Sequence, residues 1–248
     1  MLRVDGADQS HVDLDDPTRL EFDYVRRIGD VLDAWQPAGE PLRILHVGGA
    51  AMTLPRYVAA TRPRSHQIVL EPAVALTELV RSELPLPRRS GIKVRPVDGR
   101  VGTAQLRENS TDVVILDAFD GARVPAELVT LEYIESVSRA LTSSGWFLLN
   151  LTDRAPFAWT RRVVAGLRLV FPELMVSAEP ATLRGRRFGN LLVVASHGLV
   201  PIGALQQRAA SSAAPYRVLD AAQVSSTLGG GAAFVDGDCQ PSPLTAYR

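Results

Sequence analysis

The feature that most constrains the fold is an alternation of short apolar runs with longer amphipathic segments, repeated five times between residues 42 and 171. The apolar runs have the length and composition of buried strands, and the amphipathic segments have helical spacing. The expected strands are 42–47, 66–72, 93–97, 112–117 and 146–151, and the expected helices are 54–60, 73–84, 130–141 and 157–171. Because the crossover between parallel strands returns over the sheet with a fixed hand, this alternation predicts a doubly wound, mostly parallel α/β sheet with helices on both faces.

Two further strands, 174–178 and 190–196, are separated by a polar turn that is too short for a crossover helix. They are therefore expected to be antiparallel at one edge, which makes a seven-stranded sheet with an antiparallel last strand. Five parallel units closed by such a pair are similar in order to the class I methyltransferases that use S-adenosylmethionine (AdoMet), which have a Rossmann-like fold.

The segments on either side of this unit differ from it in character. Residues 1–40 are acidic and contain one helical pattern, 18–34, with Asp16 as its expected N-cap. The apolar stripe of this helix either packs on the domain or forms a dimer seam. From residue 198 onward Ala, Gly and Ser dominate, so a loosely packed appendage is expected. The expected division is a short N-terminal helical segment (1–40), a Rossmann-like domain (41–197) and an appendage (198–248).

Charge and cysteine content argue against several classes of function. Lys+Arg and Asp+Glu are both 27, so no net field favours nucleic acid or an anionic membrane surface. Cys239 is the only cysteine and the four histidines are scattered, which leaves neither a disulfide framework nor a spacing of metal ligands. No run reaches the roughly 18 apolar residues of a membrane span, and the first residues are acidic where a signal peptide would be basic. We expect a cytoplasmic protein without a metal ion.

Glycines or a carboxylate follow successive expected strands, at the sheet edge where open parallel sheets bind ligands. Gly48 and Gly49 end the first strand; they allow a close approach to a nucleotide but are also typical of a tight turn. Glu71 ends the second strand and could accept from both ribose hydroxyls, or lie in solvent at a helix start. Asp98 follows the third strand and could accept from an adenine amino group, or only stabilise a turn. Their coincidence at one edge favours a nucleoside site.

The fourth strand ends in "ILDAFDG", which places two carboxylates around a phenylalanine. Asp117 ends an apolar run, so its side chain is expected on the floor of a cleft, where a buried carboxylate needs a partner. Asp120 can face the same cavity, and Phe119 can form its wall. Two acids there suit a cationic ligand such as an amine, and either could accept its proton. The alternative is that they cap the helix that follows.

Together these motifs resemble the polyamine aminopropyltransferase (spermidine synthase) family, in particular its divergent spermidine synthase-like branch. The likeness covers about residues 9–196 and rests on "SHVDLDDPTRLEFDYVRRI", "RILHVGGAAMTLPRYV", "VLEPAVALTELVR", "VRPVDGR" and "DVVILDAFDGARVPAELVTLEYIESVSRALTSSGWFLLNL". The last stretch is the most specific. Members of the family move an aminopropyl group from decarboxylated AdoMet to an amine such as putrescine and release methylthioadenosine.

The resemblance implies a role for each candidate residue. It implies that Asp117 is the catalytic base, that Asp120 holds the acceptor amine, and that Phe119 belongs to the same substrate site. The residues that it implies in nucleoside binding are Gly48, Gly49, Ala50, Glu71, Asp98 and Gly99. It also implies decarboxylated AdoMet or AdoMet as the donor, a small amine or polyamine as the partner, and a homodimer.

The sequence departs from the family pattern mainly on the amine side. Ala50 and Ala51 stand where the glycine-rich motif usually has an acid, residues 20–22 lack the family's tyrosine, and Gly121 follows Asp120 where a proline is usual. The motif "VLE" has one acid where the family has two, and the N-terminal β-domain is shortened. Two alternatives therefore stay open: an AdoMet-dependent small-molecule methyltransferase, and a catalytically inactive nucleoside-binding protein of the same fold.

Overall fold

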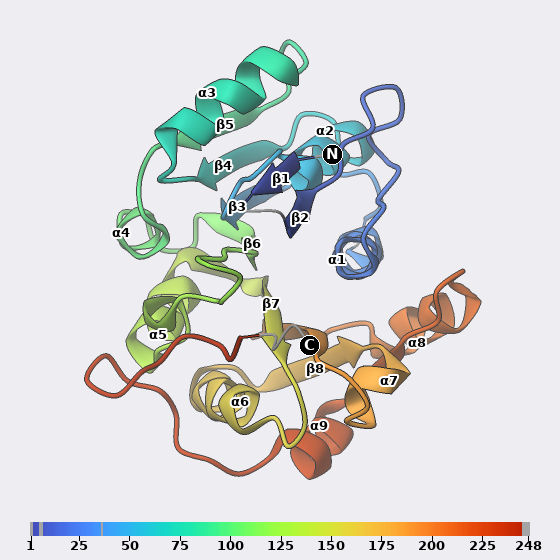
Figure 1. Cartoon of the computed structure of the whole chain (residues 1–248), viewed down its shortest axis with the longest axis vertical. Helices are drawn as coiled ribbons and strands as arrows, with labels where there is room; N and C mark the ends of the chain where they lie inside the picture. The colour runs from blue at the N-terminus through green and yellow to red at the C-terminus, as the bar shows by residue number, and fades with distance from the viewer. Residues whose placement is uncertain (1, 5–6, 36, 245–248) are drawn as a thin grey trace.

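A mostly parallel sheet with helices on both faces forms the centre of the computed structural model, which describes residues 2–4, 7–35 and 37–244 (Figure 1). Its strands are β3 (Arg43–Val47), β4 (His66–Leu70), β5 (Ile92–Arg95), β6 (Thr111–Leu116), β7 (Leu141–Asp153), β8 (Glu173–Ala178), β9 (Gly189–Ser196) and β10 (Arg217–Leu219). Within the described residues the order of these eight strands is β10-β8-β9-β7-β6-β3-β4-β5. Strands β3 to β7 are parallel, and β9 is antiparallel to both of its neighbours.

This order confirms the predicted doubly wound fold with an antiparallel strand near one edge. The sheet has one strand more than the seven predicted, because β10 pairs antiparallel with β8 at the edge. That strand is only three residues long and lies among Ala- and Ser-rich segments, so no alternating pattern marks it in the sequence.

The helices cover both faces of the sheet and enclose two apolar cores. They are α1 (Asp23–Ala34), α2 (Thr53–Thr61), α3 (Val74–Glu83), α4 (Gly99–Ala104), α5 (Leu131–Ala140), α6 (Ala158–Val170), α7 (Pro180–Leu183), α8 (Ile202–Ser211) and α9 (Ala221–Leu228), with one 3-10 turn, η1 (Ala126–Leu128). Core residues of α5, α6 and α9 pack on one face of the sheet, and those of α1, α2 and α8 pack on the other. Figure 1 shows α4 and α5 along one side and α1, α2 and α8 along the other.

Helix α1 begins later than predicted, at Asp23 with Phe22 in the N-cap position. The expected cap, Asp16, instead accepts hydrogen bonds from the backbone and hydroxyl of Thr18, which forms a local turn. The predicted apolar stripe is real but lies inside the molecule, since Ile28 is 0% exposed. It packs against the sheet, so the dimer-seam interpretation of this stripe is wrong.

The segment after residue 198 is better packed than its composition predicts. Over residues 198–244 it forms α8, β10 and α9, and three of its apolar side chains, Val224, Leu228 and Phe234, are 0% exposed. The expectation of a loosely packed appendage is therefore wrong for these residues. A few well-spaced large side chains fill the core, while most of the abundant Ala and Ser residues are exposed or half-buried.

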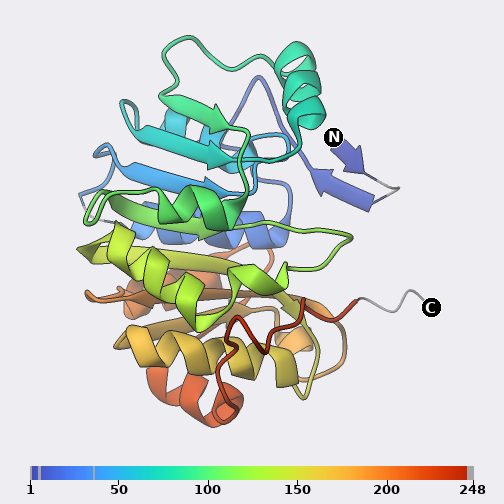
Figure 2. The same cartoon turned by 90° about the vertical axis from the view of Figure 1, so that its left-hand side faces the viewer.

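The chain also has a small antiparallel hairpin before α1, formed by β1 (Leu2–Val4) and β2 (Ala7–Ser10). Figure 2 shows this hairpin beside the edge toward which the parallel strands point. None of the described helices combines the length and apolar character needed to cross a membrane.

Candidate functional site

The carboxyl ends of β3, β4 and β6 meet at Gly48. Its φ of +93° is a left-handed conformation that favours glycine. A Cβ atom at this position would lie 2.4 Å from the carbonyl oxygen of Asp117. The Gly48 N–H donates to the Leu70 carbonyl at 3.0 Å. The glycine therefore lets the end of β3 lie directly against the segment that carries Asp117.

Glu71 holds the loop after Gly48 in its shape. One oxygen of its carboxylate accepts from the N–H groups of Gly49 and Ala50, at 3.1 and 3.2 Å, and the other accepts from Ala73 at 3.0 Å. The side chain is buried, which contradicts the alternative of a solvated carboxylate. Ribose binding by Glu71 stays a prediction, and the observed bonds assign it a loop-shaping role as well.

The same loop contains two non-glycine residues with positive φ, Ala50 at 40° and Met52 at 62°. Left-handed conformations of this kind are unfavourable for residues with a side chain, and they persist only where the surroundings enforce them. They occur often at ligand sites. The strain thus marks the loop between β3 and α2, in agreement with its predicted place in a nucleoside site.

Asp98 is the N-cap of α4, so the turn interpretation describes its observed bonds. Its Oδ1 accepts from the N–H groups of Arg100 and Val101 at 2.8 and 3.2 Å. The adjacent Gly99 packs so closely that a Cβ atom would lie 2.4 Å from a methyl carbon of Val47. This places Asp98 next to the end of β3, and contact between its second oxygen and an adenine stays a prediction.

Asp117 follows β6 as a partly exposed carboxylate with a buried partner. Its Oδ1 accepts a hydrogen bond from Nδ2 of Asn150 at 2.8 Å, and Oδ1 of Asn150 in turn accepts from Nδ2 of Asn190 at 3.0 Å. Removal from water raises the pKa of Asp117 to about 6, although the bond from Asn150 acts in the opposite direction. Neither Asp117 nor Asp120 caps a helix, because the N-cap positions of η1 and α5 are Pro125 and Thr130.

Three polar residues around Asp117 were missed in the sequence. Asn150 is 1% exposed within the apolar run "WFLLNLT", and an amide at such a position was a detectable signal because a buried amide needs partners. Asn190 gave no comparable signal. Tyr24 lies within the helical pattern of residues 18–34, and burial and the negative charge of Asp117 raise its pKa well above the usual value.

An open groove of about 360 Å³ lies beside this network. We call it the α1 groove, and its lining residues are Glu21, Phe22, Asp23, Tyr24, Arg27, Glu179 and Asn190. The rings of Phe22 and Tyr24 are stacked with centroids 6.1 Å apart. Because Asn190 lines the groove and bonds to Asn150, the groove reaches the neighbourhood of Asp117.

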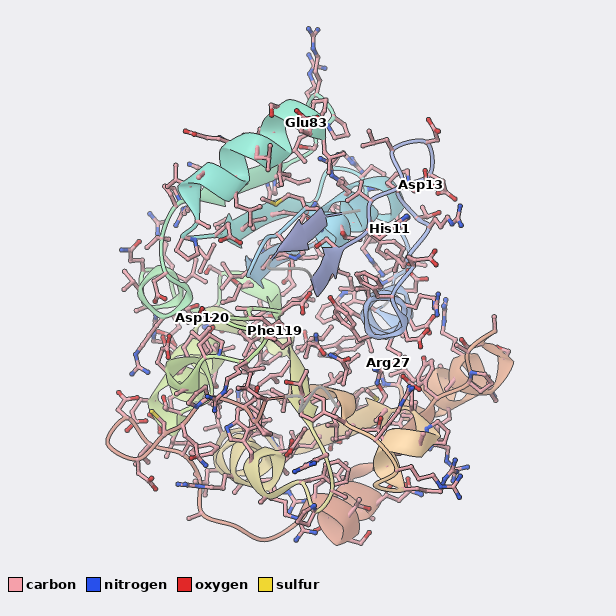
Figure 3. The ribbon with its side chains drawn as sticks, in the orientation of Figure 1. His11, Asp13, Arg27, Glu83, Phe119 and Asp120 are labelled. Atoms are coloured by element: carbon pink, nitrogen blue, oxygen red, sulfur yellow. The ribbon has the colours of Figure 1, made fainter. Side chains whose placement is uncertain are left out.

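Phe119 and Asp120 lie together on the loop after β6, and Arg27 lies across the molecule on α1 (Figure 3). Phe119 is partly buried and packs against the apolar core. Asp120 is exposed, and its backbone forms a pair of hydrogen bonds with Arg123 at 2.8 and 3.0 Å. The place of Phe119 in the wall of the site and contact between the Asp120 carboxylate and an amine both stay predictions.

The fold and site geometry can be compared with known proteins. A protein described as a probable spermidine synthase from Corynebacterium glutamicum superposes with a TM-score of 0.82 and 29% identity, over 94% of this chain and 84% of that one. A polyamine aminopropyltransferase from Chromobacterium violaceum is 27% identical over 143 residues, which are 57% of this chain and 53% of that protein. One from Vibrio vulnificus is 28% identical over 135 residues, 53% of this chain and 44% of that protein. The chain is therefore similar in sequence to polyamine aminopropyltransferases and in fold to a probable spermidine synthase.

The chain matches these curated relatives over only part of their length. The chain spans about half the length of those first relatives, and no family model matches its sequence. Human methyltransferase-like protein 13, solved in complex with SAH, shares the fold with a TM-score of 0.54 at 23% identity. This chain and that methyltransferase therefore share one Rossmann-like architecture.

The part of the chain that the structure describes has no cluster of side chains suited to a metal ion. Among residues 2–4, 7–35 and 37–244, no group of three or more His, Cys, Asp or Glu side chains is placed to hold a metal ion. What the site does provide is a loop with exposed backbone at one side, a carboxylate with raised pKa in the middle and a groove with acids and aromatic rings at the other side.

Proposed function

We propose that this chain is a transferase that moves an aminopropyl group from decarboxylated AdoMet to an amine such as putrescine. The observation that carries the proposal is Asp117. Its backbone lies against Gly48, and its carboxylate is held by Asn150, whose neighbour Asn190 lines the α1 groove, and has a pKa raised to about 6. A base with this pKa is ionised at neutral pH and is close enough to the working pH to exchange protons efficiently.

The proposed reaction requires alignment and a proton acceptor. The acceptor amine loses a proton to Asp117, and the freed lone pair attacks the carbon bonded to the donor's positively charged sulfur. The carbon–sulfur bond breaks, its electron pair stays on sulfur, and methylthioadenosine leaves as a neutral thioether. Because the leaving group is already activated by its charge, the protein's main task is to hold the two reactants in line.

On the donor side, the loop from Gly48 to Ala50 supports the proposal. The closeness of Gly48 to the Asp117 backbone leaves no room for a side chain, and the hydrogen bonds to Glu71 hold the loop in one shape. In the proposal Glu71 binds the ribose through the remaining lone pair of the oxygen that accepts from Ala73, and Asp98 binds the adenine through Oδ2, while Gly99 allows close packing at α4.

On the acceptor side, the α1 groove supports an amine as substrate. Glu21, Asp23 and Glu179 supply negative charge, and the paired rings of Phe22 and Tyr24 supply a surface on which an aliphatic amine can lie. Asp23 and Glu179 are already paired with Arg26 and Arg187, so the groove is only moderately acidic. The exposed Asp120 would attract the same cation from the opposite loop.

Replacing Asp117 by Asn tests the proposal. The change preserves size but removes the base, so we expect the rate of aminopropyl transfer, followed by mass detection of the product, to fall by about 100- to 10,000-fold. Binding of methylthioadenosine, followed by calorimetry, should be unchanged. The matched control is Asp112→Asn, at the opposite end of the same strand, where the carboxylate pairs with Arg43 far from the site.

Three outcomes would contradict the proposal. If Asp117→Asn retains turnover within about tenfold of the original rate, Asp117 is not the base. If the chain methylates a small molecule with AdoMet and gives no aminopropyl product, the methyltransferase alternative holds. Binding of methylthioadenosine without transfer to any amine tested would favour the nucleoside-binding protein.

The proposal includes a homodimer that works in the cytoplasm. The dimer follows from the family resemblance, and the single cysteine, Cys239, suits a reducing compartment. Since the apolar stripe of α1 is buried within the chain, a dimer would use another surface.

A further inference from the structure

Residues 229–244, which we call the strap, follow α9 and run back along the molecule toward the candidate site. Figure 1 shows this segment, in orange to red, passing outside α6 and α5 and then turning toward β7. Phe234 anchors its first part. The ring is 0% exposed, its centroid lies 6.0 Å from that of Trp159, and the guanidinium of Arg162 lies 4.0 Å from its centroid. The backbone carbonyl of Phe234 accepts from the N–H of Leu131 at 2.8 Å.

The middle of the strap binds beside the predicted nucleoside edge. Asp236 forms an ion pair with Arg100, whose backbone N–H is bonded to the cap residue Asp98. The Arg100 guanidinium also donates to the Glu127 carbonyl at 2.9 Å and to the Thr130 hydroxyl at 3.1 Å. The strap therefore fixes the first turn of α4 to the start of α5.

The last part of the strap binds the loop that carries Phe119 and Asp120. The Oγ atom of Ser242 accepts from the N–H of Val124 at 2.9 Å, and the Ser242 N–H donates to the Val124 carbonyl at 3.1 Å. The same Oγ atom lies 3.1 Å from the hydroxyl of Thr152 on β7. Arg123 donates to the carbonyls of Ser242 and Pro241, and its own backbone is paired with Asp120.

The contacts of Ser242 are directional hydrogen bonds, which close packing alone would not require. Ser242 is 0% exposed, and a buried hydroxyl that completes several hydrogen bonds fixes one geometry, whereas an apolar residue of similar size would fill the space without doing so. Between Asp236 and Ser242 the strap connects the two loops that frame the site, one at Asp98 and one at Asp120.

We propose that the strap is a positioning element of the site, and that Ser242 and Arg123 hold the loop of residues 118–124 at a fixed distance from the nucleoside edge. Neither residue touches a reacting atom. The inference rests on the proposed function for its catalytic consequence, but the mechanical part, that the strap orders this loop, is independent of any reaction.

The test is hydrogen exchange combined with kinetics on Ser242→Ala and Arg123→Lys. Ser242→Ala leaves the Val124 N–H buried without its acceptor, so we expect the amides of residues 118–124 to exchange about 5- to 30-fold faster. Arg123→Lys keeps the charge but cannot hold two carbonyls with a planar fork, and should give a smaller increase. We expect kcat to fall more in Ser242→Ala than in Arg123→Lys, and we expect the affinity for methylthioadenosine to stay unchanged in both. The control is Ser226→Ala on the exposed face of α9.

Exchange of residues 118–124 within twofold of the original chain in both variants would overturn the inference. So would faster exchange with an unchanged kcat, because the loop's order would then not matter to the site. If the original chain transfers no aminopropyl group, the proposed function fails, and the exchange rates alone decide whether the strap orders the loop. Arg123 lies near the surface, so its variant keeps the test decisive if Ser242→Ala does not fold.

Discussion

Asp117 is a carboxylate whose position costs stability at the pH where it would act as a base. Its pKa of about 6 in the folded chain lies above the ordinary value of 3.8, so the folded state binds more protons than the unfolded state between roughly pH 4 and 6. Stability therefore falls as the pH rises through this window, and the cost is fully present at neutral pH. Such a cost is typical of functional residues.

We predict that Asp117→Asn stabilises the chain at pH 7.5. The neutral amide can still accept from Asn150 and carries no charge to desolvate, so the free energy of unfolding should rise by roughly 1–3 kcal/mol, given a shift from 3.8 to about 6 and partial solvent screening. Urea unfolding at pH 7.5 and at pH 3.5 measures this. The gain should vanish at the lower pH, and an equal gain at both pH values would show that the charge is not its cause.

Asn150 should control the proton affinity of Asp117. Because its hydrogen bond lowers the pKa of the carboxylate, Asn150→Ala should raise that pKa above about 6 and move the acidic limb of the rate profile to higher pH. Asn190→Ala removes only the bond behind Asn150 and should give a smaller shift. Profiles of kcat/KM against pH measure both. Equal shifts, or a loss of rate without any shift, would contradict this role.

At the scale of elements, the long periodic segments were predicted well and the caps were not. Strands β3 and β6 match because burial of both faces leaves a continuous apolar run, and helix α5 matches because burial of one face imposes a helical period. The predicted start of α1 was wrong because the Asp16 carboxylate accepts from Thr18 in a local turn instead of capping the helix. Helix α4 was missed, since six residues beginning with a glycine carry too little pattern.

The turn between β3 and α2 allows a prediction with a matched control. Gly48 and Gly121 both have positive φ, +93° and +52°, but only at Gly48 would a Cβ atom overlap a neighbour, the Asp117 carbonyl at 2.4 Å. Both alanine variants should lose roughly 1–2 kcal/mol from the backbone conformation. Gly48→Ala should lose more and also weaken methylthioadenosine binding. Thermal unfolding and calorimetry measure the difference, and equal effects of the two changes would contradict the close approach of β3 to Asp117.

At the scale of the whole molecule, the site contains residues from segments that are far apart in the sequence, and no local sequence pattern predicts that these segments come together. Tyr24, Asn150 and Asn190 come from α1, β7 and β9, and they form the polar surroundings of Asp117, which follows β6. The sheet edge itself could be predicted, because parallel strands must end together. The neighbours supplied by α1 and by the antiparallel strand could not, since their placement depends on side-chain fit across the finished fold.

Arg27 carries this long-range assembly and provides a last prediction. It is 2% exposed, and its guanidinium donates to the Ser177 carbonyl at 2.7 Å and to the Asn190 carbonyl at 3.2 Å, which fastens α1 to β8 and β9. Burial lowers its pKa only to about 10, so it stays charged at neutral pH.

Replacing Arg27 by Met should fill the space but leave these carbonyls without donors, and the free energy of unfolding should fall by about 2–3 kcal/mol. Arg26→Met, one residue earlier, removes a half-exposed pair with Asp23 and should cost less than about 1 kcal/mol. Urea unfolding of the two variants compares them directly.

The Asn190 side chain is hydrogen-bonded to Asn150, which in turn is hydrogen-bonded to Asp117. Arg27→Met should therefore also disturb the pH dependence of turnover, whereas Arg26→Met should not. Equal stability of the two variants would mean that α1 is held by its apolar stripe alone, and Tyr24 would then owe its place beside Asp117 to packing rather than to this charged anchor.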